Sequence, residues 1–481
     1  MGKAVETIHV EAPATWRMRP IYLVISVLVI TYVATTGIGA SLFPFQFGRD
    51  QLVAFSYPQQ VPLDWMTSLG SPLYWSLLFS MVVIAPLAAF LAEHFARQMI
   101  SMQRRPDIAV WIPIAVAAAM AAFCIYKLAM AEALSAHELW DRSICSHEKL
   151  LRRIELYGLL GNRYYAFAYS SLPIVGCYLL AQGITQRNAP ALIGWATVSA
   201  MTLWFDVAMM TKAPAVIYVG TVGLTLALCG FGALRSALLA LPLAIVVYAG
   251  LSLLLNCTGE TAPWERTLPS GTTAAEFSST VASPQTPASP RSATVPDRTS
   301  SQDPSLSTPT GPSRPLIDTA FIALRTVLFR MAAGFPYYVQ IFSEPDQRCG
   351  IEHPPLRWLP PRTCFGPTKV YSKMRPLVTY ATGFQPGPVN VSAYGEAGLW
   401  YVIAATAACG LILGILVSFA GGRDPLSIAI IVACCIYAYY ATQVSLTGSL
   451  IDSYGLIWLI LPLILMVAIS AVSHARIRSR T

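Results

Sequence analysis

The chain has 481 residues, of which 55% are hydrophobic and 12% are Asp, Glu, Lys or Arg. Soluble domains carry about 25% charged residues, so this composition excludes an ordinary water-soluble globular protein. The apolar residues form runs near the ~20 residues that a helix needs to cross a bilayer, rather than the alternating segments of outer-membrane barrels. The formal charge of +8 is dispersed, which disfavours nucleic acid as a partner and favours membrane lipids or a phosphorylated lipid.

The sequence predicts an all-α polytopic membrane protein with about ten transmembrane helices and one large external loop. Arg17 and Arg19 precede the first span, which places the N-terminus in the cytoplasm, and alternation places the C-terminus there as well. The predicted spans are, in chain order, 21–43, 73–92, 110–133, 164–182, 190–208, 213–232, 236–255, 397–419, 425–443 and 455–472.

The segment 134–163 conflicts with this sidedness, because it carries Arg142, Arg163 and three further cations but falls on the outer side. Three interpretations remain open. In the first, the number of spans is miscounted and the segment is cytoplasmic. In the second, the cations of the segment contact an external anionic ligand. In the third, the segment forms an amphipathic helix on the lipid headgroups. Glu148 and Arg152 have the i,i+4 spacing that the third interpretation requires.

Composition divides the chain into four parts. They are 1–255 with about seven spans, 256–315 as a disordered Ser/Thr/Pro-rich external linker, 316–396 as an ordered external loop, and 397–481 with about three spans. In the ordered loop the run at 316–335 has helical periodicity, and it predicts a helix that stops at Gly334 and Pro336. Arg325 and Arg330 lie about 140° apart around this helix, so they need not serve one purpose.

Aromatic and Pro-rich chain follows this helix and leads to the eighth span. It contains Tyr337 and Tyr338, then His353, and finally Tyr394 and Glu396. Irregular chain of this composition beside a membrane surface is typical of a shaped site for a polar, partly apolar ligand.

Two cysteines of the same loop, Cys349 and Cys364, are fifteen residues apart. A disulfide between them in an oxidising compartment would brace the segment that holds His353, with Cys145 and Cys257 as competing partners. No CxxC, HExxH or carboxylate cluster is present, so we expect no metal site and no cofactor.

Nucleotide and hydrolase motifs are also missing from suitable positions, which leaves ATP-driven transport and soluble-type hydrolysis unsupported. One cation stands out instead. Lys212 follows Asp206 by six residues and precedes Pro214 at a short external turn between two spans. It is either a functional cation or a lysine that extends from the helix end to the membrane interface.

Three stretches lie before, within and at the end of the large loop in a recognisable order: TKAPAVIYV at 211–219, LFRMAAGFPYY at 328–338 and AYGEAGLWYVI at 393–403. Together with the many spans, they resemble the oligosaccharide repeat-unit polymerases and O-antigen polymerases of bacterial surface polysaccharide assembly. The Ser/Thr/Pro-rich insert and the basic segment 134–163 depart from that pattern.

The resemblance implies a C-type glycosyltransferase-like bundle in the bacterial inner membrane. Such an enzyme moves a growing glycan from one polyprenyl pyrophosphate onto another lipid-linked repeat unit, without a metal, and a chain-length regulator is a further partner that the resemblance suggests. Fixed cations would stabilise the leaving pyrophosphate. The implied catalytic residues are Arg330, Lys212, His353 and Glu396, and the implied substrate-binding residues are Arg325, Arg142, Arg163, Tyr337, Tyr338 and Tyr394.

Three other functions remain open. A C-type transferase that uses lipid-phosphate sugars would rely on Asp50 and Asp64 in the first external loop. An O-antigen ligase is a close variant of the polymerase. A permease or lipid-linked sugar flippase would need charged residues within several spans, where only Lys127, Glu132 and Asp206 occur.

Overall fold

A computed structural model of the chain describes residues 19–55, 68–99, 108–136, 140–141, 146–255, 325, 328–351, 364–374, 385–452 and 454–478. Within these ranges the regular structure is helical throughout. The long helices of the bundle are α1 (Pro20–Tyr32) continued by η2 (Val33–Gly37) and α2 (Ile38–Leu42), α5 (Pro72–Met99), α6 (Trp111–Met130), α9 (Asn162–Ala166) continued by η4 (Phe167–Ser171) and α10 (Leu172–Thr185), α11 (Ala189–Ala208), α12 (Ala213–Leu226) continued by η5 (Ala227–Phe231), α13 (Ala233–Leu255), α19 (Leu399–Ser418), α20 (Pro425–Ala441) and α22 (Leu456–Arg478). The shorter helices are α3 (Gln46–Phe55), α8 (Ser146–Leu160), α16 (Gly334–Ile341), η7 (Pro345–Gln347), α17 (Gly366–Met374), α18 (Val389–Ala397) and α21 (Leu446–Ile451).

Nine helical segments among the described residues are long and apolar enough to cross a membrane. They overlap nine of the spans predicted from hydropathy, so the chain fits a polytopic membrane protein. The remaining predicted span, 425–443, is helix α20, which is apolar but has only 17 residues. Helix α5 runs seven residues beyond its predicted end. Its last turns are polar, and Glu93 and Arg97 form an i,i+4 ion pair of 2.7 Å there.

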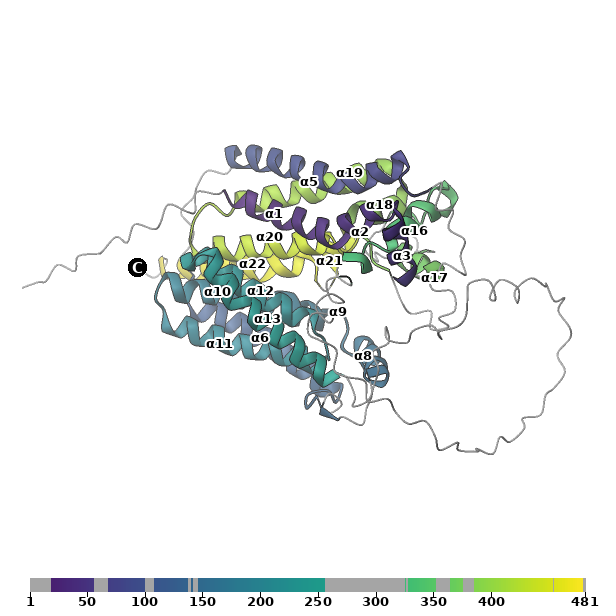
Figure 1. Cartoon of the computed structure of the whole chain (residues 1–481). Helices are drawn as coiled ribbons and strands as arrows, with labels where there is room; N and C mark the ends of the chain where they lie inside the picture. Colours follow the sequence, from purple (N-terminus) through teal and green to yellow (C-terminus); the bar gives the residue numbers. More distant parts are fainter. Residues whose placement is uncertain are drawn as a thin grey trace, which may run out of the picture.

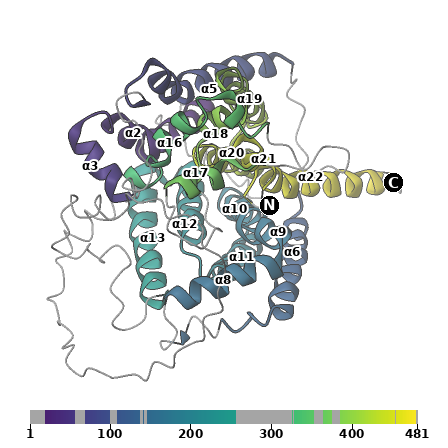
Figure 2. The same ribbon diagram turned by 90° about the vertical axis from the view of Figure 1, so that its right-hand side faces the viewer.

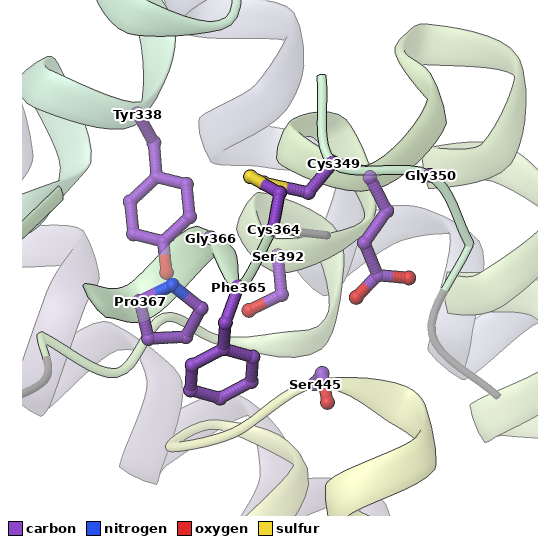
Figure 3. A pocket seen from close by; sticks show the side chains of 10 residues that line it. Tyr338, Cys349, Gly350, Cys364, Phe365, Gly366, Pro367, Ser392 and Ser445 are labelled. Atoms are coloured by element: carbon purple, nitrogen blue, oxygen red, sulfur yellow. A yellow bond between two sulfur atoms is a disulfide. The ribbon is translucent and has the colours of Figure 1, made fainter. Parts of the chain in front are cut away.

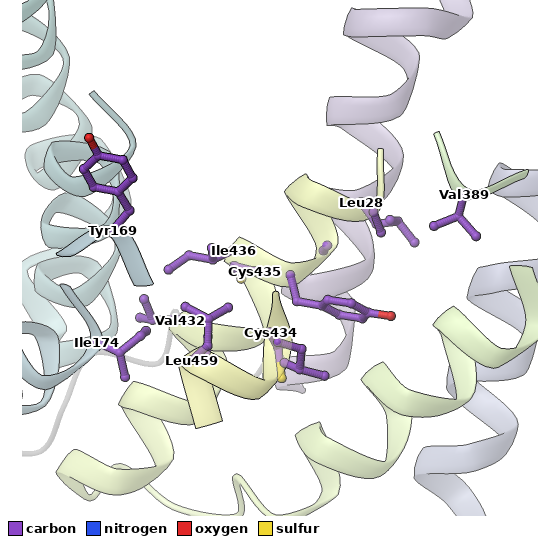
Figure 4. Close-up of a cluster of buried hydrophobic side chains, with 14 of the residues drawn as sticks. Leu28, Tyr169, Ile174, Val389, Val432, Cys434, Cys435, Ile436 and Leu459 are labelled. Carbon is purple, nitrogen blue, oxygen red and sulfur yellow. The ribbon is translucent and has the colours of Figure 1, made fainter. Parts of the chain in front are cut away.

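Helix α20 lies at the centre of the bundle, between two groups of helices (Figure 1). It packs against α1 and α19 on one side and against α10 and α12 on the other, and α22 runs beside it. Nearly all of its residues are buried. Figure 4 shows Ile174 of α10 close to Val432 of α20, with Leu28 and Val389 beyond the opposite face. Protein therefore surrounds this short helix, as it also surrounds the longer segment Asn162–Thr185, which is 89% buried.

Helices α5 and α19 form the closest pair in the bundle. Gly410 and Gly414 of α19 face the α5 backbone, and a Cβ atom at either position would collide with a carbonyl oxygen, of Ala85 and Ala89 respectively. Small residues four apart let two helices approach until their backbones touch, and this contact stabilises helix pairs in membranes.

Most of the helix predicted at 316–335 lies outside the described residues, which include only 325 and 328–335 of it. Residues 328–330 are helical and a turn follows at 331–333, so the helix ends before the predicted stop at Gly334 and Pro336, and α16 begins at Gly334 itself. Pro336 lies in the first turn of α16, where backbone N–H groups have no partner within the helix, so its missing N–H costs little. Tyr337 and Tyr338 are consequently helical rather than in irregular chain. The same correction applies to Tyr394, which lies in α18.

Candidate functional site

The short helices gather at one end of the bundle, which we call the loop end. Figure 1 shows α3, α8, α16 and α17 there, and Figure 2 looks onto this end. Lys149 of α8 donates a hydrogen bond of 3.0 Å to the carbonyl of Leu254, at the point where α13 leads into the large loop. The basic segment 134–163 and the large loop therefore meet at the same end of the molecule.

Two cations of this end, Lys212 and Arg153, interact electrostatically. Lys212 caps the start of α12 after a tight turn in which Met210 has a φ of 54°. Burial, and secondly the nearby guanidinium of Arg153 from α8, lower the pKa of Lys212. The Nε atom of Arg153 is buried without a hydrogen-bond partner among the described residues. Like charges held together in a half-buried place favour an anion between them.

A row of five tyrosines runs past these cations and joins the two groups of helices. We call Tyr157, Tyr165, Tyr169, Tyr454 and Tyr440 the tyrosine row. Successive ring centroids are 4.4, 5.5, 5.5 and 5.1 Å apart, and two of the pairs are stacked. The hydroxyl of Tyr169 lies 3.1 Å from that of Thr211, next to Lys212 in the chain. Aromatic side chains thus border the cation pair.

Asp206 is the buried carboxyl nearest to this turn in the chain. Its side chain is 0% exposed, and neither carboxyl oxygen has a hydrogen-bond partner among the described residues. Its main-chain carbonyl, by contrast, accepts from the Thr211 hydroxyl at 3.2 Å. A buried carboxylate without a partner is costly, and such a group inside a membrane bundle marks a functional position.

Two adjoining pockets form a second feature of the loop end, which we call the carboxylate hollow. They share Phe365, Pro367 and Ser445. Glu396 of α18 lines the first and Asp452, after α21, lines the second. Figure 3 shows Phe365 and Pro367 along one side and Ser445 facing them from the other. The hollow combines carboxyl groups with an aromatic surface that is 42% exposed at Phe365.

A cross-linked framework holds the first of these pockets. A disulfide joins Cys349 to Cys364. The backbone N–H groups of Cys349 and Gly350 each donate 3.0 Å hydrogen bonds, to the carbonyls of Gly395 and Glu396. These carbonyls belong to the last turn of α18, where no helical partner is available. The loop therefore completes the helix end that carries Glu396.

The remaining predicted site residues are spread over the loop end. Arg330 is exposed, and its main-chain carbonyl accepts a hydrogen bond of 3.3 Å from the side-chain amide of Gln385. Lys212, by contrast, interacts with Arg153. Arg325 is half-buried, and Arg163 is exposed at the start of α9.

The three predicted stacking tyrosines are all covered by protein. Tyr337 and Tyr394 are 1% and 2% exposed, and the Arg348 guanidinium lies 5.8 Å from the Tyr394 ring. Tyr338 lines the carboxylate hollow, and its hydroxyl donates to the Gln385 carbonyl at 3.2 Å. The structure therefore does not present the rings of Tyr337 and Tyr394 to a ligand.

Some predicted residues fall outside the described part of the chain, namely Arg142, His353, Asp64 and the linker at 256–315. Asp50 is described, and it accepts an exposed hydrogen bond of 3.3 Å from Gln46 in α3. Among the described residues no group of three His, Cys, Asp or Glu side chains could hold a metal ion.

The sequence did not single out Phe365, Asp452 or the tyrosine row as site residues, and Arg153 entered only among the five cations of segment 134–163 for which an external anionic ligand is one interpretation. The pairing of Arg153 with Lys212 joins helices 59 residues apart in sequence, and neither residue lies in a local motif that links them. Phe365 could have been predicted from the sequence, because it directly follows Cys364, one of the two cysteines of the predicted disulfide.

No protein-family model, curated protein or solved structure matches the chain.

Proposed function

We propose that the protein is a membrane glycosyltransferase that polymerises polyprenyl-pyrophosphate-linked oligosaccharide repeat units into a surface polysaccharide. The observation that carries this proposal is the buried Nε atom of Arg153, which has no hydrogen-bond partner among the described residues and belongs to a cation that interacts with Lys212 at the loop end. Two fixed cations at a bilayer surface match the negative charge of a diphosphate ester. The planar guanidinium of an arginine can also donate two hydrogen bonds to such an anion at once.

The chemistry needs charge stabilisation more than a reactive side chain. A hydroxyl of the acceptor sugar attacks the anomeric carbon of the donor, and the bond from that carbon to the phosphate oxygen breaks. The pyrophosphate leaves with the bonding electrons, and Lys212 and Arg153 offset its growing negative charge. The proton of the hydroxyl passes to a carboxylate, for which Glu396 is the candidate because it lines the carboxylate hollow. Arg330 remains a second candidate cation from the loop.

This function requires the loop end to face outward. In the proposed topology α20 is the tenth span, both termini are cytoplasmic and the membrane is the bacterial inner membrane. Arg97, Arg187 and Arg423 support this orientation, because they lie at the α5 end and in the α10–α11 and α19–α20 turns, opposite the loop end. With this orientation the basic segment 134–163 is external together with the large loop.

The deciding experiment separates lipid-linked and surface glycans by size in cells that carry single variants. Lys212→Ala and Arg153→Ala should lower chain growth about 10²–10³-fold, the usual cost of losing one charge-stabilising group, and single repeat units should accumulate on the carrier. Lys373→Ala is the matched control, because Lys373 is an exposed cation of α17 at the same end. Unchanged chain lengths in both variants, with normal amounts of protein in the membrane, would overturn the proposal.

A transporter of lipid-linked sugars is the second candidate, and Asp206 favours it, since proton-coupled carriers use buried carboxyl groups. The two functions differ in where the single repeat units collect. If Asp206→Asn leaves them on the cytoplasmic face, the protein moves them across the membrane. If they reach the outer face in cells carrying the Lys212→Ala variant and only chain growth stops, the protein polymerises them.

A further inference from the structure

We propose that Asp206 anchors a sodium-binding site inside the bundle, with the hydroxyls of Thr202 and Tyr164 as further oxygen ligands. The proposal rests on neither of the functions above, although Asp206 is the residue that favours the second of them. A bound sodium ion would give these groups the partner that the described residues do not provide.

Three side chains contribute four buried oxygen atoms without hydrogen bonds. They are both carboxyl oxygens of Asp206, the Thr202 hydroxyl and the Tyr164 hydroxyl, none of which has a partner among the described residues. The three residues are 0%, 1% and 0% exposed, so bulk water does not satisfy these atoms. Buried polar groups are nearly always paired, and several that are not, in one region of a protein, indicate a bound water or ion.

The fold brings these side chains to the same part of the bundle. Thr202 and Asp206 are four residues apart in α11, so they lie on one face of that helix. The ring of Tyr164, in α9, lies 6.3 Å from the ring of Phe205, the neighbour of Asp206 in the chain. Tyr164 and Asp206 also interact electrostatically. The oxygen atoms therefore come from two helices, and a single ion can link them.

The charge of Asp206 has no counter-charge in the described part of the chain. Burial alone acts on this carboxyl, and no lysine or arginine offsets it. The other groups that interact with it electrostatically are phenols, which are ordinarily uncharged at neutral pH. They are Tyr164 of α9, Tyr169 of η4, Tyr218 of α12, Tyr440 of α20 and Tyr454 before α22. A bound cation would supply the missing charge.

The position of Asp206 within its helix also favours a cation. It lies in the last turn of α11, which ends at Ala208. The C-terminal end of a helix carries a partial negative charge, which disfavours a carboxylate and stabilises a cation. Helix ends of this kind, together with side-chain oxygens, bind sodium ions in membrane proteins.

The ligands indicate a small monovalent ion. One carboxylate balances one positive charge, whereas calcium sites use several carboxyl groups, and the described residues hold no cluster of three His, Cys, Asp or Glu side chains. A proton would neutralise Asp206 but would bond to only one of its oxygens, whereas sodium can contact all four oxygen atoms. Because all three residues are buried, the site should bind sodium better than the larger potassium ion.

Thermal unfolding of the full chain in lipid nanodiscs tests the proposal in NaCl, KCl and choline chloride at equal ionic strength. Sodium should raise the unfolding temperature in proportion to the logarithm of its concentration, and potassium should do so less. At 100 times the dissociation constant the ratio of folded to unfolded protein should rise about 100-fold. Binding of radioactive ²²Na⁺ to the native chain measures the site directly and needs no variant.

Three variants examine the ligands one by one. Asp206→Asn keeps the shape and removes the charge, so it should abolish both the sodium response and ²²Na⁺ binding. Thr202→Val and Tyr164→Phe each remove one hydroxyl and should weaken binding.

Two matched controls should keep the full sodium response. Thr225→Val removes a buried hydroxyl that already donates a 2.8 Å hydrogen bond to the Thr221 carbonyl. Asp346→Asn removes an exposed carboxylate in η7.

Two results would overturn the sodium site. One is the same unfolding temperature in all three salts, with a changed pH dependence in Asp206→Asn, because the carboxyl would then hold a proton. The other is equal ²²Na⁺ binding by the native chain and Asp206→Asn. Neither measurement depends on polymer synthesis. If sodium binds as proposed but Lys212→Ala and Arg153→Ala leave chain length unchanged, the polymerase proposal fails and the sodium site stands.

Discussion

Asn390 of α18 donates a hydrogen bond of 3.1 Å to the hydroxyl of Tyr32 in α1, across 358 residues of sequence. The same amide nitrogen lies 2.7 Å from the carbonyl of Leu77 and 3.1 Å from the hydroxyl of Ser80, both in α5. Asn390 is 0% exposed. One side chain therefore ties the helix that carries Glu396 to two spans of the bundle.

Replacing this amide should loosen the loop end. Asn390→Leu removes the donor and leaves buried acceptors on α1 and α5, and polar contacts between membrane helices contribute about 0.6–1.7 kcal/mol. We expect a lower unfolding temperature in detergent and shorter glycans. An unfolding temperature equal to that of the native chain would show that the amide contributes nothing.

The contact between α5 and α19 should tolerate no side chain at Gly414. A Cβ atom there would lie 2.8 Å from the Cβ of Ala92 and 2.9 Å from the backbone nitrogen of Glu93. Gly414→Val should cost about 1–3 kcal/mol, the range for overpacking a filled interface. Gly220→Val is the control, because nothing lies within 4 Å of a Cβ at that position. Thermal unfolding of both purified variants checks this, and similar stabilities would contradict it.

The pKa of Lys212 predicts a pH dependence of stability. Its pKa is lowered in the folded protein, so between that value and the ordinary 10.5 the unfolded chain binds more protons. The free energy of unfolding should therefore rise with pH over this interval in the native chain, relative to Lys212→Met. Below the interval the penalty for burying the charge is fully present, and Lys212→Met should be the more stable protein.

Arg153 is the second cause of that lowered pKa, so Arg153→Met should make the rise smaller. Chemical denaturation at a series of pH values measures all three chains. A difference between the native chain and Lys212→Met that stays constant up to pH 10.5 would show that Lys212 is not perturbed.

The disulfide should matter for stability. It closes a loop with a sequence separation of 15, for which chain entropy predicts about 3 kcal/mol. The double variant Cys349→Ser, Cys364→Ser should unfold at a lower temperature. Cys229→Ser, at a half-buried free cysteine, should behave as the native chain. A reductant should destabilise the native chain and not the double variant, and an effect on both would locate the sensitivity elsewhere.

Hydropathy predicts the helical bundle well, because each long helix must present apolar side chains over its length whichever neighbours it has. The limits of α5 and α16 escaped prediction for local reasons. A side-chain ion pair between Glu93 and Arg97 lies in the part of α5 beyond its apolar run. Pro336 lies in the first turn of a helix where it was expected to end one, because the backbone N–H groups of that turn have no partner within the helix.

The candidate site was predictable only in part. Lys212 and Glu396 could be chosen by their position at span ends. Arg153 and Asp452 acquire their meaning from neighbours distant in sequence, so a single sequence holds no local pattern for them. Tyr337 and Tyr394 were predicted to bind a ligand, but their rings are buried in the protein. An aromatic residue beside a membrane serves packing as readily as binding, and the sequence alone does not distinguish the two roles.

The central place of α20 also sets an order for biosynthesis. Ribosomes deliver α1 and α10 to the membrane first, and 424 residues precede Pro425 in the chain. Until that helix inserts, the faces of α1 and α10 that it will cover must be shielded by lipid or by a chaperone. Of the long helices, only α22 follows α20 in the chain, so the axis of the bundle is among its last parts to assemble. A nascent chain that stalls before Pro425 presents an uncompleted core to the quality-control machinery of the cell.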